Sequence, residues 1–295
     1  MIEYRIPEAL AAMSARAFLQ KHTGASLTLW RKIKRSQSFC CNGILVNPAF
    51  ATVHPGDIIS YEIPDTSRME PIDLPLDIRY EDDTLLIVNK PAGQLVHPTS
   101  QNHIPTLANA VLFYYKQTHQ AYAFHPMHRL DRQTSGLVLI AKQPQLQHLL
   151  TTKNGHCFQR KYLALIEGQL APADGSIQSP IARKPGSIIE RIVSPDGSPA
   201  LTWYHTLATS PAMSLLELTL ATGRTHQIRV HLSSLGHPLL GDDLYGGSRK
   251  YISRQALHAA QITFNHPLNN KDISVNAELP DDMHSISTHL NKIPL

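Results

Sequence analysis

Short apolar runs that end at turn-forming residues are the feature that most limits the fold of this chain. Starting at residues 84, 136, 161, 215 and 261, they read TLLIVNK, GLVLIAK, KYLALIEG, LLELTLATG and QITFNHP. Apolar runs of this length that end at Gly, Pro, Asn or Lys are typical of buried strands. Because they do not alternate regularly with helical segments, a doubly wound parallel fold is not expected. We predict an α+β fold with a mixed, mainly antiparallel sheet and flanking helices.

Residues 1–68 are expected to form a small α/β domain of their own. Helices are predicted at residues 8–22 and 27–36, the second capped by Ser26. The Asn42-Gly43 pair that follows predicts a tight turn between two short strands. The second helix also carries a cluster of basic side chains, which are Arg31, Lys32, Lys34 and Arg35.

A proline-rich stretch at residues 69–79 is predicted to be a linker to a larger domain, residues 80–295. Besides the strands named above, this domain is expected to contain helices at residues 106–118, 146–153 and 226–235. We find no internal repeat and no low-complexity tract.

Charge and cysteine content narrow the class of protein. The 295 residues are 42% hydrophobic, enough for a substantial core, and carry a net charge of +4. That small excess permits an acidic partner such as RNA but does not require one. Cys40 and Cys41 are adjacent, Cys157 is distant, and no C-x-x-C pair occurs, so a reduced chain is expected. Without a signal peptide or a long apolar run, we expect a soluble cytoplasmic protein.

One carboxylate in a basic setting stands out in HPMHRLDRQTSGLVLIAK, residues 125–142. Asp131 lies between Arg129 and Arg132, just before a predicted core strand. In one interpretation it is a turn residue, because Asp accepts backbone N–H bonds and Thr, Ser and Gly follow it. In the other it is a reactive carboxylate, kept ionised by neighbouring arginines and able to act as a nucleophile. The local sequence does not decide between these.

A second basic cluster lies in TGRTHQIRVHLSSLGHPLLGD, residues 222–242. Four basic residues lie near the start of a predicted helix: Arg224, His226, Arg229 and His231. Cations at a helix N-terminus are typical of a phosphate or carboxylate site, although an ordinary exposed helix face can show the same pattern. His226 and His231 are five residues apart, which is not the spacing of a helical metal-binding pair, and no H-E-x-x-H motif occurs. We therefore predict no metal site.

Two further features are weak when taken alone. Tyr162 begins an apolar strand and is either a core residue or a ring that stacks on a base. Lys90 precedes Pro91-Ala92-Gly93, and a plain hairpin turn is favoured there over a catalytic lysine.

Together these segments resemble one family. HRLDRQTSGLVLIAK resembles the signature of the RluA-type pseudouridine synthases. Further segments resemble that family in the same order, over about residues 80–280: YEDDTLLIVNKPAGQLVHP, RKYLALIEG, ATGRTHQIRVHLSSLGHPLLGDDLYGG and RQALHAAQITFNHP. The first domain resembles an S4-type RNA-binding domain, with FCCNG in place of the usual Val-Asn-Gly turn. Gln133 departs from the family pattern, which often has an acid there.

The resemblance implies that uridine within folded RNA is converted to pseudouridine. The base leaves its N1 bond to the sugar, rotates and rejoins through C5, so no cofactor, metal or nucleotide is needed. Asp131 would be the carboxylate beside C1′, where positive charge develops as in glycoside hydrolysis. Arg224 would be the cation beside it, and Tyr162 would stack on the uracil.

The resemblance also implies how RNA is held. The target base must be flipped out of its stack, and Arg129 would fill the space that it leaves. Arg132, His226 and Arg229 would hold phosphates, together with Thr134 and the basic cluster of the first domain.

Two alternatives belong to other classes of protein. A structured-RNA-binding protein that has lost its chemistry would lack one of Asp131, Tyr162 and Arg224, but all three are present. A nucleoside or sugar hydrolase would need a second acid across the scissile bond, for which Glu167 and Asp242 are the candidates. Ribosomal RNA is the favoured substrate and transfer RNA the second choice. We expect a monomer with no membrane partner.

Overall fold

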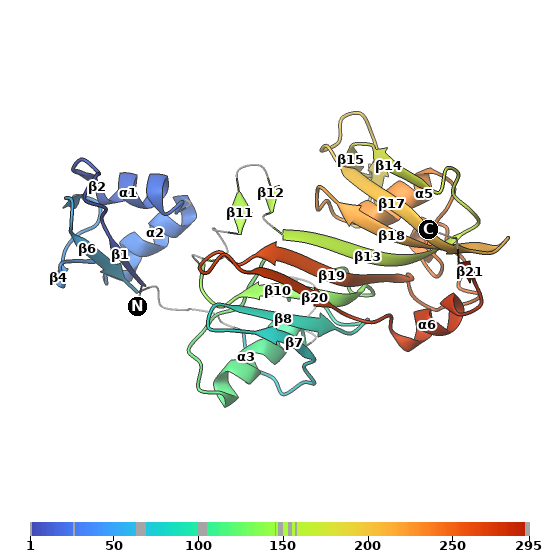
Figure 1. Cartoon of the computed structure of the whole chain (residues 1–295), viewed down its shortest axis with the longest axis horizontal. Helices are drawn as coiled ribbons and strands as arrows, with labels where there is room; N and C mark the ends of the chain where they lie inside the picture. The colour runs from blue at the N-terminus through green and yellow to red at the C-terminus, as the bar shows by residue number, and fades with distance from the viewer. Residues whose placement is uncertain are drawn as a thin grey trace.

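The computed structural model describes residues 2–25, 27–62, 69–98, 105–144, 146, 150–152, 155–156 and 158–292. Figure 1 shows their helices and strands. The described residues up to 61 have a hydrophobic core of their own, built around Phe18, Trp30, Ile33, Phe39 and Tyr61.

The first part of the chain combines two helices with short strands. Its elements are β1 (Ile2–Arg5), β2 (Met13–Ser14), α1 (Ala15–His22), α2 (Leu27–Ser36), β3 (Cys40–Cys41), β4 (Ile44–Leu45), β5 (Thr52–Val53) and β6 (Ile58–Tyr61). Strands β1, β6, β3 and β4 form one sheet in that order, and β2 pairs with β5.

The first predicted helix is half as long as expected. Helix α1 begins only at Ala15, because Met13 and Ser14 pair with β5 and the Ser14 hydroxyl caps the helix by accepting a bond from Ala17 N–H at 3.2 Å. The second helix, α2, is confirmed. Its predicted cap, Ser26, lies outside the described residues. The turn after β3 is also confirmed, with positive φ angles of 53° at Asn42 and 77° at Gly43.

The larger part is built on one long sheet. Its strands run β14 (Asp174–Gln178), β17 (Leu201–Thr209), β18 (Met213–Leu220), β13 (Phe158–Glu167), β19 (Leu257–Asn265), β10 (Ser135–Ala141), β8 (Leu85–Lys90) and β7 (Ile78–Glu81). Strands β9 (His125–Pro126), β20 (Asp272–Asn276) and β21 (Asn291–Lys292) pair with β10, β19 and β17. The remaining elements are α3 (Leu107–Gln117), β11 (Thr151–Thr152), β12 (Gly155–His156), β15 (Ile181–Arg183), β16 (Arg191–Val193), α5 (Gln227–Ser234), the 3₁₀ turn η1 (Asp243–Tyr245) and α6 (Asp281–Ser287).

The predicted mixed, mainly antiparallel sheet is confirmed. Among the described pairs of this sheet, β10 with β19 is parallel and the others are antiparallel. Each of the five apolar runs lies within or largely within a strand. Because β19 lies between β10 and β13, it joins the two halves of the sheet.

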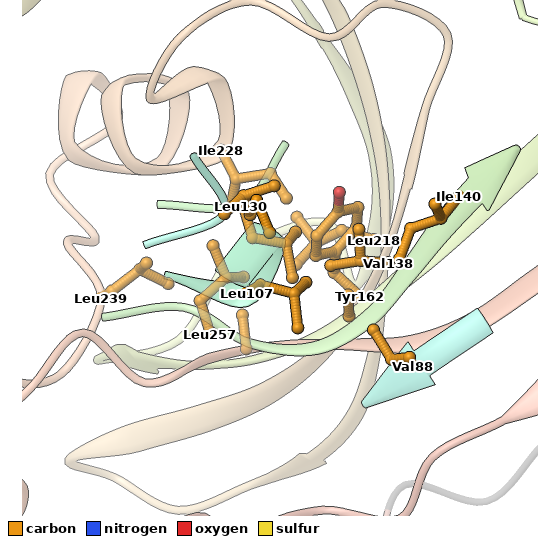
Figure 2. Close-up of a cluster of buried hydrophobic side chains, with 14 of the residues drawn as sticks. Val88, Leu107, Leu130, Val138, Ile140, Tyr162, Leu218, Ile228, Leu239 and Leu257 are labelled. Atoms are coloured by element: carbon orange, nitrogen blue, oxygen red, sulfur yellow. The ribbon is translucent and has the colours of Figure 1, made fainter. Parts of the chain in front are cut away.

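Side chains of alternate residues supply two cores, one on each face of the sheet. Val88, Val138 and Tyr162 face one cluster, which the helices α3 and α5 cover with Leu107 and Ile228 (Figure 2). The neighbouring positions, among them Ile87, Leu137 and Leu139, face a second cluster. The period of two that defines strands thus sets which side chains reach the helix-covered face.

Two of the three helices expected in the larger part are confirmed, as α3 and α5. The third, at residues 146–153, lies partly outside the described residues. Cys157 also lies outside them. The helix prediction is confirmed at Leu146, which is helical and accepts a bond from Leu150 N–H at 3.0 Å, but it is wrong at Thr151–Thr152, which form β11 and pair with β12.

The stretch predicted to be a linker is attached to the larger part rather than free. Met69 and Leu76 pack against the helix-covered core, and Asn109 Nδ2 donates to Glu70 O at 2.7 Å. The domain limits proposed above otherwise stay a prediction.

Candidate active site

Asp131 lies on a loop that enters β10, and contacts from several elements hold this loop. Thr134 N–H closes the turn on Asp131 O at 3.1 Å. The Arg132 side chain donates from Nε to Gly93 O at 2.9 Å, while Gly93 N–H donates to Arg132 O at 2.8 Å. From the other side, Gln255 Nε2 donates to the Thr134 hydroxyl at 2.7 Å. The carboxylate therefore sits on a tightly supported turn.

A close approach of two strands fixes the end of this loop. Gly136 has a φ of +114°, and a Cβ there would lie 2.4 Å from both N and O of Ala259 in β19. Only glycine fits, because any larger residue would push β10 away from its parallel neighbour.

Arg229 links Asp131 to a second carboxylate. Its Nη1 lies 2.9 Å from Asp131 Oδ2, and its Nε and Nη2 lie 2.7 and 2.8 Å from the two oxygens of Asp242. The Arg229 side chain is 7% exposed. Burial opposes its charge, but the hydrogen bonds and charges of Asp242 and Asp131 outweigh this and raise the pKa of Arg229. The result is a buried cation that holds Asp131 by a charge-assisted bond.

His226 approaches the same carboxylate from the start of α5. Its Nε2 lies 3.6 Å from Asp131 Oδ2, and its Nδ1 lies 2.7 Å from the Tyr245 hydroxyl. Burial lowers the pKa of His226, an effect that the Asp131 charge opposes and the Arg229 charge reinforces. His226 is therefore neutral at neutral pH. Tyr245 also lies under the Arg229 guanidinium, 4.9 Å from ring centroid to Cζ.

A cavity of about 60 Å³ opens beside the carboxylate. Tyr162 reaches it from β13, nearly buried within the core that Figure 2 draws, and burial raises the pKa of its hydroxyl. The residues that line the cavity are Arg129, Leu130, Asp131, Thr134, Tyr162, Leu220, Arg224, His226, Gln227, Ile228, Arg229 and Leu257. Carboxylate, phenol and guanidinium groups from three separate segments thus face one space.

No candidate metal site, meaning three or more His, Cys, Asp or Glu side chains placed to hold an ion, is found among the described residues. Within the same residues, no helix has the length and apolar character needed to cross a membrane.

Comparison with known proteins identifies the family. A family model described as RNA pseudouridylate synthase matches residues 84–234, which include Asp131, Tyr162, Arg224 and Arg229. The chain belongs to this family. The resemblance of the larger part of the chain to the RluA-type pseudouridine synthases is therefore confirmed.

Relatives of this pseudouridine synthase cover most of its length. An uncharacterised RNA pseudouridine synthase of Bacillus subtilis is 41% identical over 238 residues, 78% of this chain and 83% of the relative. The ribosomal large subunit pseudouridine synthase D of Haemophilus ducreyi is 36% identical over 299 residues, 96% of this chain and 89% of the relative. Among solved structures, human RNA pseudouridylate synthase domain containing 4 superposes with a TM-score of 0.59 at 25% identity, covering 74% of this chain and 95% of that one.

Most of the expected site residues of this synthase share the cavity. Asp131, Tyr162 and Arg224 all line it, as do Arg129, Thr134, His226 and Arg229. Arg132 does not line it and instead braces the loop through Gly93. The four basic residues of α2, which are Arg31, Lys32, Lys34 and Arg35, are exposed on the first part of the chain.

The cation next to Asp131 is a different arginine from the one expected. The family resemblance predicts that Arg224 makes this contact, but in the structure Arg229 makes it. Arg224 precedes α5 and turns its Nε to Pro199 O at 3.0 Å, whereas Arg229 lies inside the helix on the side facing Asp131. Arg229 was expected to hold phosphate. Its burial between two carboxylates is not consistent with that role.

Three contributors to the site were missed or given another role. Asp242 had been considered only as a second acid for a hydrolase, but it is buried and paired with Arg229. Tyr245 was not singled out. Lys90 is fully buried, and its Nζ donates to Pro91 O, Gln94 O and Arg132 O at 2.8, 2.9 and 3.3 Å. The position of Lys90 at the end of an apolar strand is the sequence feature that could have indicated its buried role.

Burial lowers the pKa of Lys90 to about 7, while the nearby Asp131 carboxylate acts in the opposite sense. The other hydrolase candidate, Glu167, accepts a bond from Ser248 N–H and does not line the cavity.

Proposed function

We propose that this chain converts specific uridines of ribosomal RNA to pseudouridine, with Asp131 as the essential carboxylate. The observation that carries the proposal is the Asp131 carboxylate, held by Arg229 at a cavity that Tyr162 also lines. Cleavage of the N-glycosidic bond develops positive charge at C1′, which an adjacent carboxylate stabilises or traps. Because Arg229 already orients Asp131 through a bond of 2.9 Å, little reorganisation is needed when that charge develops.

Tyr162 is assigned a stacking role. Its ring is fixed in β13 within the core, so it offers a rigid face to a uracil that has been flipped out of its helix or loop. A cavity of about 60 Å³ is well below the few hundred Å³ of ordinary ligand sites. Exposed side chains at the rim, Arg129 and Arg224, must therefore move when the base enters.

Ribosomal RNA is favoured over transfer RNA by the relatives. The Haemophilus ducreyi protein, named as a ribosomal large subunit enzyme, aligns over 96% of this chain and so includes its first part. We assign residues 1–68 to an S4-like domain whose α2 cluster holds structured RNA by its phosphates. A ribosomal RNA substrate places the reaction in the cytoplasm, and we propose that a monomer carries it out.

The deciding experiment removes the gene from its host and maps pseudouridines in ribosomal and transfer RNA by carbodiimide labelling and primer extension. We expect one or a few ribosomal sites to disappear and to return with the wild-type gene. The Asp131→Asn gene should not restore them, although the purified variant should bind target RNA within a few-fold of wild type.

The outcomes separate the alternatives. If Asp131→Asn restores the sites, the assigned chemistry is wrong. If purified wild-type protein modifies neither ribosomal nor transfer RNA transcripts but binds them, the chain is a structured-RNA-binding protein. Sites lost from transfer RNA alone would overturn the choice of substrate.

A further inference from the structure

A second, larger cavity lies next to the active cavity and shares a wall with it. Its volume is about 380 Å³, within the range of ordinary ligand sites. Arg224 lines both cavities. The other residues that line the second one are Ile181, Ala182, Arg183, Arg191, Asp196, Gly197, Ser198 and Thr225.

The second cavity is a built part of the fold. It is formed by the paired strands β15 and β16 together with residues 196–198, which return to β15. Ile181 and Ser198 exchange two backbone hydrogen bonds of 2.9 Å, and a Cβ on Gly197 would lie 2.5 Å from the Ile181 backbone. Val230 of α5 packs against Ile181 below the hairpin. Its walls are therefore fixed by strand pairing and close backbone contact.

Three guanidinium groups give this cavity its charge. Among the described residues, no ion pair joins Arg183, Arg191 or Arg224 to a carboxylate. Arg191 donates from Nη1 to Ile189 O and Glu190 O at 3.2 and 3.1 Å. With five N–H groups on each arginine, donors remain for a ligand.

Other charges on the hairpin are either opposed or already paired. Asp196 also lines the cavity and opposes an anion, so three cations face one acid. On the same hairpin, Lys184 is already paired with Glu190 at 2.8 Å.

The hairpin is also tied to the active site through Tyr245. The hydroxyl of Tyr245 accepts a bond from Arg191 N–H at 2.9 Å, and it lies 2.7 Å from His226 Nδ1. His226 in turn faces Asp131. A ligand bound to Arg191 and Arg224 would therefore be separated from the catalytic cavity by a single side chain.

The geometry points to a phosphodiester of the substrate RNA as the ligand of this second cavity, on a nucleotide next to the flipped uridine. Guanidinium groups match phosphate oxygens in charge and in fork geometry. RNA threaded past the active cavity brings a phosphate to its rim, and Arg224 spans both sites. This inference rests on the proposed function. It adds Arg183 and Arg191 as positioning residues that hold the strand while Asp131 acts.

The test removes positive charge from the second cavity by changing two arginines that do not line the active cavity. Arg183→Gln/Arg191→Gln should raise the Kd for a target transcript about ten-fold and lower the slope of log K against log salt by about 1 to 2. At saturating RNA, kcat should stay within about three-fold of wild type. Arg183→Lys/Arg191→Lys should restore most of the salt slope, and Asp196→Asn should tighten binding.

Arg249→Gln/Lys250→Gln is the matched control, because it removes two positive charges from exposed residues that line neither cavity. It should change the Kd less than two-fold. If the hairpin variant misfolds by circular dichroism, Arg183→Gln alone replaces it.

Synthetic RNA with single methylphosphonates near the target uridine locates the contact. Wild type should lose affinity at one neutralised phosphate, and the hairpin variant should lose little more there. The inference is overturned if the hairpin variant binds RNA like the control variant does. It is also overturned if the hairpin variant binds inorganic phosphate more weakly than wild type but binds RNA equally well. Both readouts measure binding, so they remain decisive if the wild type produces no pseudouridine, a result that would contradict the proposed function alone.

Discussion

At the scale of single residues, the buried guanidinium of Arg229 is paired with two carboxylates, those of Asp131 and Asp242. Breaking a buried ion pair by removing one partner leaves an uncompensated charge, which costs about 3–5 kcal/mol. Here the loss would affect two acids, Asp131 and Asp242. Arg224 has no such partner in the described part of the chain.

The contrast between the two arginines is directly testable. Arg229→Gln should reduce kcat by more than 100-fold and lower the free energy of unfolding by about 3 kcal/mol. Arg224→Gln should leave the free energy of unfolding within about 0.5 kcal/mol and act mainly on KM. Single-turnover assays and urea denaturation measure both. The opposite order of effects would restore Arg224 to the role first expected from the motif.

A buried histidine next to the site gives the protein an acid-sensitive stability. His258 is 1% exposed, and its Nδ1 lies 2.9 Å from the Ser135 hydroxyl. Burial, reinforced by the Arg254 charge, lowers its pKa to about 4. Between pH 6.5 and 4 the unfolded chain therefore binds a proton that the folded chain does not, so stability falls on acidification.

Each pH unit in that window costs about 1.4 kcal/mol, or roughly 3 kcal/mol in all. In urea denaturation from pH 7 to 4, His258→Gln should lose about 3 kcal/mol less than wild type. Parallel curves for the two proteins would show that His258 does not titrate in this way.

At the scale of elements, Lys90 joins the end of β8 to the loop that carries Asp131. It donates to carbonyls on both sides of the Pro91–Gln94 turn and to Arg132 O on the loop. Lys90→Met keeps the volume but leaves these carbonyls without that donor. We expect unfolding to require about 2–4 kcal/mol less, since a buried unsatisfied group costs about 1–3 kcal/mol.

Turnover of Lys90→Met should fall further than its RNA affinity, because the change loosens the loop of Asp131. Denaturant titration and filter binding check the two parts. Wild-type turnover in this variant would mean that Gly93 and Arg254 hold the loop without help.

The sequence predicts elements well where one residue pattern determines them. The five apolar runs form strands, of which β8 and β10 are buried on both faces, while the runs in β18 and β19 alternate between buried and half-buried positions. Asn42-Gly43 forms a turn because both residues accept positive φ. Helix 8–22 was predicted too long because Ser14 was not recognised as a cap. The partner of Asp131 could not be read locally, because Arg229 is 98 residues away and only packing selects it over Arg224.

At the scale of the whole molecule, the basic face of α2 should anchor RNA outside the catalytic cavity. Changing Arg31, Lys32, Lys34 and Arg35 together to Ala should weaken binding of structured RNA at least ten-fold and flatten its salt dependence. The value of kcat at saturating RNA should be preserved. Fluorescence anisotropy over a salt series measures the slope, and an unchanged slope would mean that this face is merely solvated.

Strand β19 has a consequence for how the protein is made. It lies between β10, which leads from Asp131, and β13, which carries Tyr162, yet it comes near the end of the chain. A nascent chain therefore carries Asp131, Tyr162 and Arg229 before the two halves of the sheet can join. Such non-local pairing is slow and leaves strand edges open while translation continues. The cavity therefore assembles only after residues 257–265 have been made, and a polypeptide that stops short of Leu257 would hold Asp131, Tyr162 and Arg229 without bringing them together.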